Sequence, residues 1–444
     1  MRLKSIFIAN LSEAAIPLAH LMNKSRAKEE IFEDHALCDR FMFSDNDNFL
    51  LITPFLIDRT FISDAKKILN NSNILNLAPV KVGESICESI LKDKKLAVNV
   101  VELIRDNSNI SLKSYVASDE FLKLISHLKK LNLQFDTPET PGEKYYKTTR
   151  YFDSKSGFRQ TATKFGKGFL ALPKGFICHG INEVHKSAKY FLSQKKGCVV
   201  KTDKGLAGAG LSIIHWQEIK NNNLDSLINH RLTDKKYWLH ETSVVEEFIE
   251  PDLKICGGAP NIELKIIDDK VIPFYVCGMR INSDGVFKGV EMGKNAVPNY
   301  LTRKLIKHGN ILGNYLKNKG YRGFFEIDFV FGKNGRLYPI EANLRRTGGT
   351  HVFELCKKLL GNNFQKNYYI VANSITPALK LKNKSYSYVM NKLKNYLYPI
   401  NGKKEGIIIS VYSYLEKGNL GYVVVGNSRM RVIEIETSFL KLIS

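Results

Sequence analysis

The sequence predicts a globular protein of mixed α and β structure, in which an N-terminal α/β unit precedes a longer region of strands, glycine turns and helices. Its 444 residues, 44% hydrophobic and 25% charged, suffice for about three domains with a large core. Apolar residues are spread evenly along the chain, which excludes disorder as its main state. No apolar run reaches about 18 residues, so we expect a soluble intracellular protein without a transmembrane helix or signal peptide.

The first 150 residues alternate between strand-like and helix-like patterns. Apolar runs at 5–9, 49–52 and 96–101 predict strands. Stretches such as Asp119–Lys130 repeat apolar residues three and four positions apart, which predicts helices. The polar, Pro- and Gly-containing segment 136–142 then predicts a linker.

The last part of the sequence predicts a small separate module. A Lys-, Asn- and Tyr-rich segment at 380–398 predicts a helix. The β-branched runs 406–413 and 421–425 predict two strands around a turn at 417–419. We therefore expect three domains, at 1–145, 146–380 and 381–444.

The chain is strongly basic. It contains 66 Lys and Arg against 44 Asp and Glu, a formal net charge of +22 at pH 7. Such a surplus favours polyanionic partners. The basic residues are scattered, however, and their longest runs are pairs such as Lys129 and Lys130. A solvated basic surface is therefore the preferred interpretation, and a dedicated nucleic-acid face is the alternative.

The cysteines give no sign of a metal or disulfide framework. They lie far apart, at positions 38, 87, 178, 198, 256, 277 and 356. None has the Cys-x-x-Cys spacing of zinc and dithiol sites. Most lie within apolar runs, which predicts buried free thiols in the reducing cytoplasm.

A lysine precedes a glycine-rich turn in the middle of the chain. The segment 198–214 predicts a strand containing Lys201, a loop with Gly205, Gly208 and Gly210, and a returning strand. Glycines let backbone N–H groups close over phosphate oxygens, and a lysine adds a positive charge there. The loop lacks the G-x-x-x-x-G-K-[ST] pattern, so a plain structural turn is an equal alternative.

A second segment, 244–252, runs from an apolar strand into acidic residues. The backbone of such a strand can bind adenine, while a carboxylate just beyond it binds ribose hydroxyls. For this segment alone, a strand end with solvated acids is the commoner outcome.

The sharpest pattern is a predicted hairpin at 323–343, with an Asn-Gly turn between two strands. Alternation places Glu326 and Asp328 on one face of the first strand, and Glu341 and Asn343 on one face of the second. Antiparallel pairing can then bring Asp328, Glu341 and Asn343 together. Two carboxylates and an amide oxygen suit an octahedral Mg²⁺ that also keeps water and nucleotide phosphates. A polar hairpin without a metal is the alternative.

In this order the three segments resemble the ATP-grasp superfamily, over about residues 150–355. The turn at 172–176 also fits that family. A closer resemblance, to peptide ligases of the pheganomycin-biosynthesis type, is carried by the string Glu-Ala-Asn-Leu-Arg-Arg-Thr-Gly-Gly-Thr-His at 341–351 and the segment 421–428. The resemblance implies an α+β protein: an ATP-grasp core between an N-terminal α/β (pre-ATP-grasp) domain and a small C-terminal module.

The resemblance also implies the site residues. Those expected to bind ATP are Lys155, Lys201, Gly205, Gly208, Gly210, Glu246, Glu247, Phe248, Ile249 and Asp252, with Glu250 as the alternative to Asp252 on the ribose. Those expected to bind Mg²⁺ (or Mn²⁺) are Asp328, Glu341 and Asn343. Glu326 stands where the D-alanine-ligase branch has an arginine for the oxyanion. That role, with binding of the carboxylate, therefore moves to Arg280, Arg345 or Arg346.

The implied activity is carboxylate–amine ligation. The carboxylate attacks the γ-phosphate of MgATP to give an acyl phosphate and ADP, and an amine then displaces phosphate. The substrates would be a small-molecule carboxylate and an amine, an amino acid or a peptide; a homodimer is compatible, and neither a membrane nor a nucleic acid is expected. His179 and His351 are candidate bases, although each is more often structural. The alternatives are an ATP-grasp enzyme with a non-amine acceptor, and a basic nucleic-acid-binding protein with a relict nucleotide fold.

Overall fold

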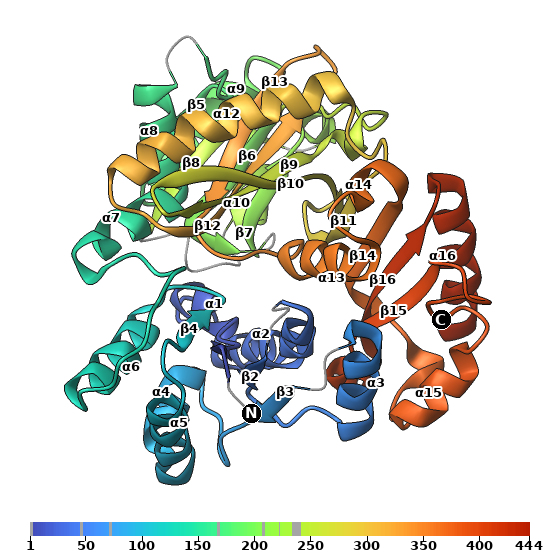
Figure 1. Ribbon diagram of the computed structural model, residues 1–444. Coiled ribbons are helices and arrows are strands. Elements are labelled where there is room, and N and C mark those ends of the chain that lie inside the picture. The colour runs from blue at the N-terminus through green and yellow to red at the C-terminus, as the bar shows by residue number, and fades with distance from the viewer. Residues whose placement is uncertain are drawn as a thin grey trace.

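The computed structural model describes residues 3–444 except 45–47, 71–72, 167–168, 207–208, 222 and 233–240; at 206, 209, 220 and 221 it describes the backbone alone. Within these residues the chain forms three sheets, of four, eight and four strands, with helices packed around them (Figure 1). No helix of the described part is both long and apolar enough to cross a membrane.

The N-terminal unit is built on a parallel sheet, called here the N-terminal sheet, with the strand order β3-β2-β1-β4. Its strands are β1 (Ser5–Ile8), β2 (Phe49–Ile52), β3 (Ile74–Leu77) and β4 (Ser111–Ser114). Its helices are α1 (Ser12–Ala19), α2 (Lys24–Ala36), the 3-10 helix η1 (Leu37–Phe43), α3 (Arg59–Leu69), α4 (Ile86–Lys92), α5 (Lys94–Asp106) and α6 (Asp119–Lys130). Every residue of β1 and β2 is buried, as expected for a parallel sheet that is covered on both faces.

Two of the three predicted N-terminal strands are confirmed, and the predicted helix Asp119–Lys130 is α6. The predicted strand at 96–101 is wrong, because this segment lies inside helix α5. Asp93 caps that helix by accepting a hydrogen bond from the backbone N–H of Leu96. Leu96, Val100 and Ile104 are buried one turn apart. The β-branched run was therefore one apolar face of a helix.

A small antiparallel sheet of order β5-β8-β6-β7, called here the small sheet, follows two helices in the middle of the chain. Its elements are α7 (Glu143–Asp153), α8 (Lys155–Phe165), β5 (Gly175–His179), α9 (Ile181–Leu192), β6 (Cys198–Leu206), β7 (Ala209–Ile214), the 3-10 helix η2 (Trp216–Asn221), α10 (Leu224–Leu232) and β8 (Thr242–Glu247). Cys198, Val200 and Val245 bury one face of this sheet in a core with α9 and α10. The strand register therefore places Val199, Lys201 and Glu246 on the opposite face.

A large antiparallel sheet of order β13-β12-β9-β10-β11-β14-β16-β15, called here the large sheet, forms the centre of the molecule. Its strands are β9 (Pro260–Ile267), β10 (Lys270–Ile281), β11 (Phe287–Gly293), β12 (Gly323–Phe331), β13 (Leu337–Asn343), β14 (Tyr369–Pro377), β15 (Gly406–Val411) and β16 (Asn419–Gly426). Its helices are η3 (Cys256–Gly258), α12 (Asn299–Asn318), α13 (Thr350–Leu360), α14 (Phe364–Asn367), η4 (Leu379–Leu381), α15 (Tyr386–Leu393), η5 (Ser413–Lys417) and α16 (Arg429–Ile443). The predicted C-terminal strands are confirmed, and they extend this sheet. The division into three domains stays a prediction.

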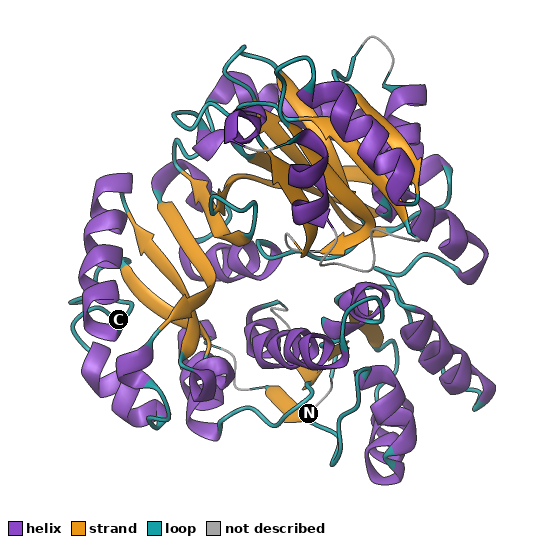
Figure 2. Cartoon of the chain, turned by 180° about the vertical axis from the view of Figure 1, so that it is seen from behind, coloured by secondary structure: helices purple, strands orange, loops and turns teal. Residues whose placement is uncertain are grey.

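One helix covers strands β9 and β10 of the large sheet, and another covers its C-terminal strands β14, β15 and β16. Helix α12 packs closely on β9 and β10, where a Cβ at Gly313 would lie 2.5 Å from Val271 Cγ1. Helix α16 lies along the C-terminal strands, as the view from behind shows (Figure 2). The prediction of buried free thiols is confirmed for six cysteines: all seven are free, and all but the half-buried Cys256 are buried.

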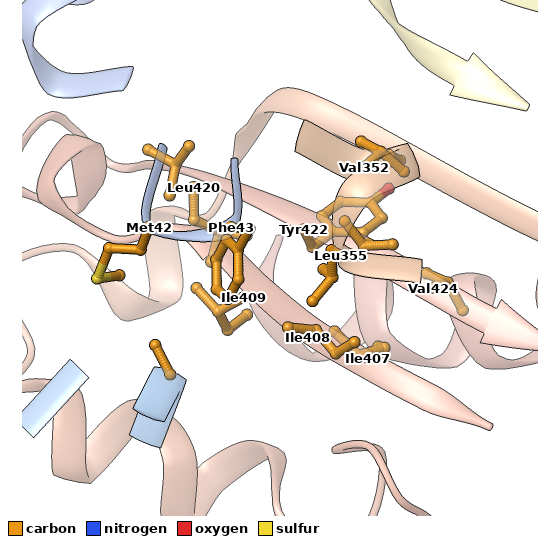
Figure 3. Packing of buried hydrophobic residues seen from close by; sticks show 14 of the residues in the cluster. Met42, Phe43, Val352, Leu355, Ile407, Ile408, Ile409, Leu420, Tyr422 and Val424 are labelled. Carbon is orange, nitrogen blue, oxygen red and sulfur yellow. The ribbon is translucent and has the colours of Figure 1, made fainter. Parts of the chain in front are cut away.

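The N-terminal unit joins the C-terminal strands through one hydrophobic cluster. Met42 and Phe43 of η1 lie beside Ile409 and Leu420 of the large sheet, in a cluster that also contains Leu355 of α13 (Figure 3). All five side chains are buried. This packing fixes η1 next to α13, although the two segments are about 300 residues apart in sequence.

Candidate active site

The hairpin of β12 and β13 brings the three predicted metal ligands together. Asp328 pairs with Glu341 and Glu326 pairs with Asn343 in the strand register. Asn343 Nδ2 donates to Asp328 Oδ2 at 3.1 Å. The predicted hairpin and this juxtaposition are confirmed, while the binding of a metal there stays a prediction.

A further amide, which sequence reasoning missed, completes the surroundings of Asp328. Asn261 of β9 donates from Nδ2 to Asp328 Oδ1 at 2.5 Å and is fully buried. It reaches this place because β9 pairs with β12, a contact across more than 60 residues. Burial, and then the charge of Glu341, raises the pKa of Asp328 to about 7.

This donor set fits a divalent cation. Asp328 and Glu341 are neighbouring carboxylates whose mutual repulsion a cation would relieve. In the described part of the chain, no three His, Cys, Asp or Glu side chains are arranged to hold a metal by themselves. Carboxylate and amide oxygens suit a hard cation, which would also need phosphate oxygens or water as ligands here.

Both predicted lysines are buried, and both reach strand β13. Lys155 is the first residue of α8; its Nζ lies 2.5 Å from Glu341 Oε1 and 3.0 Å from the Gly205 carbonyl oxygen. Lys201 Nζ lies 2.6 Å from Glu246 Oε2 and 3.2 Å from the carbonyl oxygen of Ile340. Both lysines are therefore held between the small sheet and the large sheet.

The glycine-rich segment forms the predicted hairpin between β6 and β7. Gly210 has a φ of +80°, and a Cβ there would lie 2.5 Å from Thr202 Oγ1, so both the backbone and the packing require glycine. Gly205 contributes the carbonyl that accepts from Lys155. Gly208 lies outside the described residues.

Glu246 is not the solvated acid that the alternative interpretation of its segment expects. It is 5% exposed and accepts from Arg159 NH1 at 2.8 Å as well as pairing with Lys201. Arg159 also donates to the carbonyl oxygens of Pro173 and Gly175, in the turn at 172–176. Sequence reasoning left Arg159 unassigned, because its partners lie on two segments that are distant from each other in the sequence.

The chain beyond Glu246 forms one wall of a cavity of about 590 Å³. Phe248 lines it with its ring centroid 4.8 Å from that of His215. Glu250 and Asp252 lie at the same cavity, and Glu250 Oε1 pairs with Lys333 at 2.5 Å. The other two residues of this predicted segment, Glu247 and Ile249, have different neighbours. Glu247 pairs with Lys196, and Ile249 lies against Gly332.

Arg345 is the predicted arginine that the structure places beside the predicted metal ligands, Asp328, Glu341 and Asn343, which are called the metal residues below. Its NH2 donates to Asn343 Oδ1 at 2.8 Å, and its NH1 lies 3.4 Å from Tyr115 Oη. Its guanidinium also lies over the Tyr115 ring, 5.7 Å from the centroid. An N-terminal residue therefore borders the site, which the sequence pattern could not show.

The neighbouring Arg346 points away from Arg345 into an ion-pair network. Its Nε and NH2 donate to the two oxygens of Glu139, at 2.9 and 3.0 Å, and its NH1 lies 3.2 Å from Glu354 Oε2. Burial alone raises the pKa of Glu139, but the charges of Arg346 and Lys265 outweigh it and lower that pKa to about 2. Through Glu139, Arg346 thus joins the predicted linker at 136–142 to the segment that follows strand β13 of the large sheet.

The structure does not bring Arg280 to the metal residues. Met279, one position earlier, has its sulfur 3.7 Å from Asn261 Nδ2, so strand alternation turns Arg280 to the opposite face. There its NH1 lies 2.5 Å from Glu436 Oε1 of helix α16.

Behind the metal residues lies a buried pair of glutamates. Thr347 Oγ1 donates to Glu263 Oε2 at 2.6 Å and lies 3.0 Å from Glu326 Oε1. Burial raises the pKa of Glu263 to about 7, and burial followed by the charge of Asp328 raises the pKa of Glu326 well above its usual value. Sequence reasoning missed Glu263, which β9 supplies.

Neither candidate histidine base contacts the metal residues. His351 is buried near the N-terminus of α13, and burial lowers its pKa well below the usual value. His179 is exposed at the end of β5, with Nδ1 3.3 Å from Thr242 Oγ1.

Comparison with known proteins finds two sequence relatives that are ligases by name. No family model matches the sequence. One relative is the [butirosin acyl-carrier protein]–L-glutamate ligase of Niallia circulans, 23% identical over 264 residues, which are 57% of this chain and 55% of that protein. Another is the L-propargylglycine–L-glutamate ligase of Streptantibioticus cattleyicolor, 27% identical over 124 residues, 27% of this chain and 23% of that protein. The chain thus spans about half or less of the relatives it matches.

Solved structures match over nearly the whole chain. Biotin carboxylase from Campylobacter jejuni superposes with a TM-score of 0.55 and 15% identity, covering 98% of this chain and 90% of that one. N5-carboxyaminoimidazole synthetase from Staphylococcus aureus superposes with a TM-score of 0.55 and 10% identity, covering 100% and 98%. At these identities the likeness concerns the fold. That fold, like the hairpin and the glycine-rich loop above, is the ATP-grasp arrangement.

Proposed function

We propose that the protein is an ATP-dependent carboxylate–amine ligase, which forms an amide through an acyl phosphate and releases ADP and phosphate. The observation that carries the proposal is that Lys155 and Lys201 both reach strand β13 beside Asp328 and Glu341. A buried row of two cations and two carboxylates suits a polyphosphate chain and its divalent metal. Both sequence relatives are ligases by name, which favours the same class of reaction here.

The nucleotide would lie between the small sheet and the hairpin. Lys155 and Lys201 would exchange their present carboxylate partners for the α- and β-phosphates, which carry more charge. The glycine-rich hairpin, with Gly205 and Gly210, would close over the same oxygens. The segment from Glu246 to Ile249 would bind the adenine, and Glu250 or Asp252, which both line the 590 Å³ cavity, would bind the ribose.

Asp328 and Glu341, with Asn343, would hold the metal. A bound Mg²⁺ would neutralise the charge that develops on the γ-phosphate. Asn261 keeps Asp328 in place through its 2.5 Å hydrogen bond, and Arg345 does the same for Asn343. The site is therefore positioned by β9, which lies beside the hairpin, and by the segment that follows β13.

Arg345 would bind the reacting carboxylate and later stabilise the tetrahedral oxyanion. Of the three arginines expected for this role, it alone contacts a metal residue among the described contacts. Arg346 is occupied by Glu139 and Glu354, and Arg280 lies on the other face of the sheet. A guanidinium fixed in advance gives such stabilisation without reorganisation during the reaction.

The substrate would be an acidic amino acid or a peptide. L-Glutamate occurs in the names of both relatives, and the net charge of +22 favours the approach of anions. We therefore take L-glutamate as the first substrate to test, with other amino acids and peptides as its partners.

The test is a screen for ADP release with MgATP, L-glutamate and a panel of amino acids and peptides. The expected result is ADP production that depends on both substrates, together with a hydroxamate when hydroxylamine replaces the amine. ADP formed with a carboxylate but without an amide product would point to a different acceptor. Failure to bind MgATP at all would contradict the proposal.

A further inference from the structure

Helix α12 presents a basic outer side that contains no acidic residue. Leu305 and Leu312 are buried on its inner side, which packs on the large sheet, whereas Arg303, Lys304 and Lys307 are exposed. Within the described residues, none of these three cations forms an ion pair. The outer side of α12 therefore carries positive charge without an acidic neighbour in direct contact.

The neighbouring helix α8 belongs to a second segment without acids. Residues 292–325, which include α12, contain seven Lys and Arg and no Asp or Glu. Residues 154–182, which include α8, contain five Lys and Arg and again no Asp or Glu. The two helices are far apart in sequence but lie side by side in the fold (Figure 1). Basic residues that are scattered in the sequence thus meet on one side of the molecule.

Exposed lysines around the small sheet, by contrast, do have acidic partners. Lys189 Nζ lies 2.5 Å from Asp225 Oδ1, and Lys196 Nζ lies 2.7 Å from Glu247 Oε1. On α12, Lys307 instead follows other cations three and four positions earlier, a spacing at which like charges repel each other and destabilise a helix. An anionic partner would relieve this repulsion.

Three exposed aromatic rings lie along these two helices, each next to a lysine. Lys304 Nζ lies 5.9 Å from the ring centroid of Tyr300, and Lys307 Nζ lies 5.5 Å from that of Phe169. Lys164 Nζ lies 5.4 Å from the ring centroid of Phe165. The rings of Tyr300, Phe169 and Phe165 are 43%, 60% and 38% exposed. These six residues are called here the α12 face: Lys164, Phe165, Phe169, Tyr300, Lys304 and Lys307.

The three rings follow one another along α12. Tyr300 lies in its first turn, Phe169 lies beside Lys307, and Phe165 stacks on Tyr315 with the ring centroids 3.9 Å apart. Positions 300, 307 and 315 are separated by about two helical turns each, so the rings succeed one another at intervals of roughly 10–12 Å. The α12 face is therefore a row of rings that alternates with positive charges.

Such a row matches a single-stranded nucleic acid. Exposed rings let successive bases stack on them, and lysines beside the rings bind the phosphates between those bases. A duplex keeps its bases stacked inside, and an anionic membrane offers charge without flat groups that could stack. The combination of rings and unpaired lysines thus favours a single strand over both.

We propose that the α12 face binds a single-stranded nucleic acid, with bases stacked on Tyr300 and Phe169 and phosphates bound by Lys304 and Lys307. The surface is distinct from the candidate active site, because Lys155 and Phe165 stand at opposite ends of α8, about 15 Å apart along its axis. The proposal does not depend on the ligase function.

The experiment measures the fluorescence anisotropy of labelled nucleic acids with the full-length protein. The probes are oligouridylate and oligothymidylate of about 20 nucleotides, longer than the usual single-strand site of about 4–16. A DNA duplex of the same length and vesicles of anionic phospholipid are the comparison partners. We expect wild type to bind at least one single strand, to bind it less tightly as salt increases, and to prefer it over the duplex and the vesicles.

Two double variants separate stacking from charge. Tyr300→Ala with Phe169→Ala should weaken single-strand binding at least about 20-fold, since stacking contributes about 5- to 150-fold per base. Lys304→Gln with Lys307→Gln should reduce the slope of log affinity against log salt by about 1.4, because each phosphate contact contributes about 0.7.

The matched control lies on another surface. Lys384 Nζ is 5.4 Å from the ring centroid of Tyr388, which is 47% exposed, so Lys384→Gln with Tyr388→Ala removes a similar pair near α15. This variant should bind the single strand like wild type. All variants should bind MgATP as wild type does, which keeps this test separate from that of the ligase function.

The proposal is wrong if wild type binds neither single strand, if the variant without the two rings keeps wild-type affinity, or if the control loses as much affinity as that variant. Equal binding of the duplex would indicate a general polyanion surface, and tighter binding of the vesicles would indicate a membrane surface. Either result would also contradict the proposal.

Discussion

Lys155 Nζ lies 2.5 Å from Glu341 Oε1, so the first residue of helix α8 is joined directly to the hairpin of β12 and β13. Both side chains are largely buried, at 7% and 20% exposure, so water and salt screen the pair less than they screen a surface ion pair. The contact places a cation that the ATP-grasp resemblance assigns to phosphate beside a carboxylate that it assigns to the metal.

Replacing that carboxylate should stop the reaction without unfolding the protein. Glu341→Gln keeps the shape of the side chain but removes one of the two charges offered to the metal. We expect ADP formation to fall at least about a hundredfold, with a circular dichroism spectrum like that of wild type. Glu434→Gln, an exposed residue of α16, is the control and should keep full turnover. Full turnover by Glu341→Gln would remove this residue from the metal site.

Lys201→Ala should weaken the binding of MgATP. A charge-assisted contact to phosphate contributes about 1.5–3 kcal/mol, which corresponds to a loss of roughly 10- to 150-fold in affinity. Lys189→Ala, on the helix-covered side of the small sheet, removes an exposed lysine of the same subdomain and should change little. Calorimetry with MgATP measures both. If Lys201→Ala bound MgATP as tightly as wild type does, the β6–β7 hairpin would be only a structural turn.

The Glu139–Arg346 pair should contribute stability that depends on pH. The pKa of Glu139 is about 2 in the fold against an ordinary value of 4.5, so the ionised form is favoured by folding. Its contribution, about 3 kcal/mol, is complete above about pH 4.5 and is lost as the pH falls towards 2. Urea unfolding from pH 7 to pH 3 should show this loss in wild type. Glu139→Gln should be less stable at pH 7 and should lack this part of the pH dependence.

The elements that the sequence predicted well are those whose geometry is local. The hairpin of residues 323–343 and the glycine-rich turn depend on strand alternation and on residues that tolerate positive φ, which a sequence displays directly. Both arginines follow the end of β13 at Asn343, so strand alternation does not distinguish Arg345 from Arg346. What could not be assigned in advance was which of them meets a carboxylate from the linker.

The features that the sequence did not predict depend on contacts between distant segments. Asn261 joins the metal residues only because β9 lies beside β12 in the large sheet, and Glu139 is buried only because it meets Arg346. The β-branched residues of segment 96–101 predict a strand, but the segment lies in helix α5. Its buried residues Leu96, Val100 and Ile104 are four positions apart, which is the helical spacing.

The identity of the nucleotide product follows from where the charged residues lie. Lys155 and Lys201 would cover the α- and β-phosphates, and Asp328 with Glu341 would lie near the γ-phosphate, so attack should occur there. We expect ADP and phosphate in equal amounts. Stoichiometric AMP and pyrophosphate would mean that the carboxylate is activated as an adenylate instead.

The most direct measurement uses L-glutamate, or the carboxylate substrate that the screen identifies, labelled with oxygen-18 in its carboxylates. In an acyl phosphate one labelled oxygen bridges carbon and phosphorus, and it leaves with phosphorus when the amine attacks. Phosphorus NMR of a complete reaction should therefore show one oxygen-18 atom in each inorganic phosphate formed. Unlabelled phosphate, or the label in AMP, would contradict ligation through an acyl phosphate.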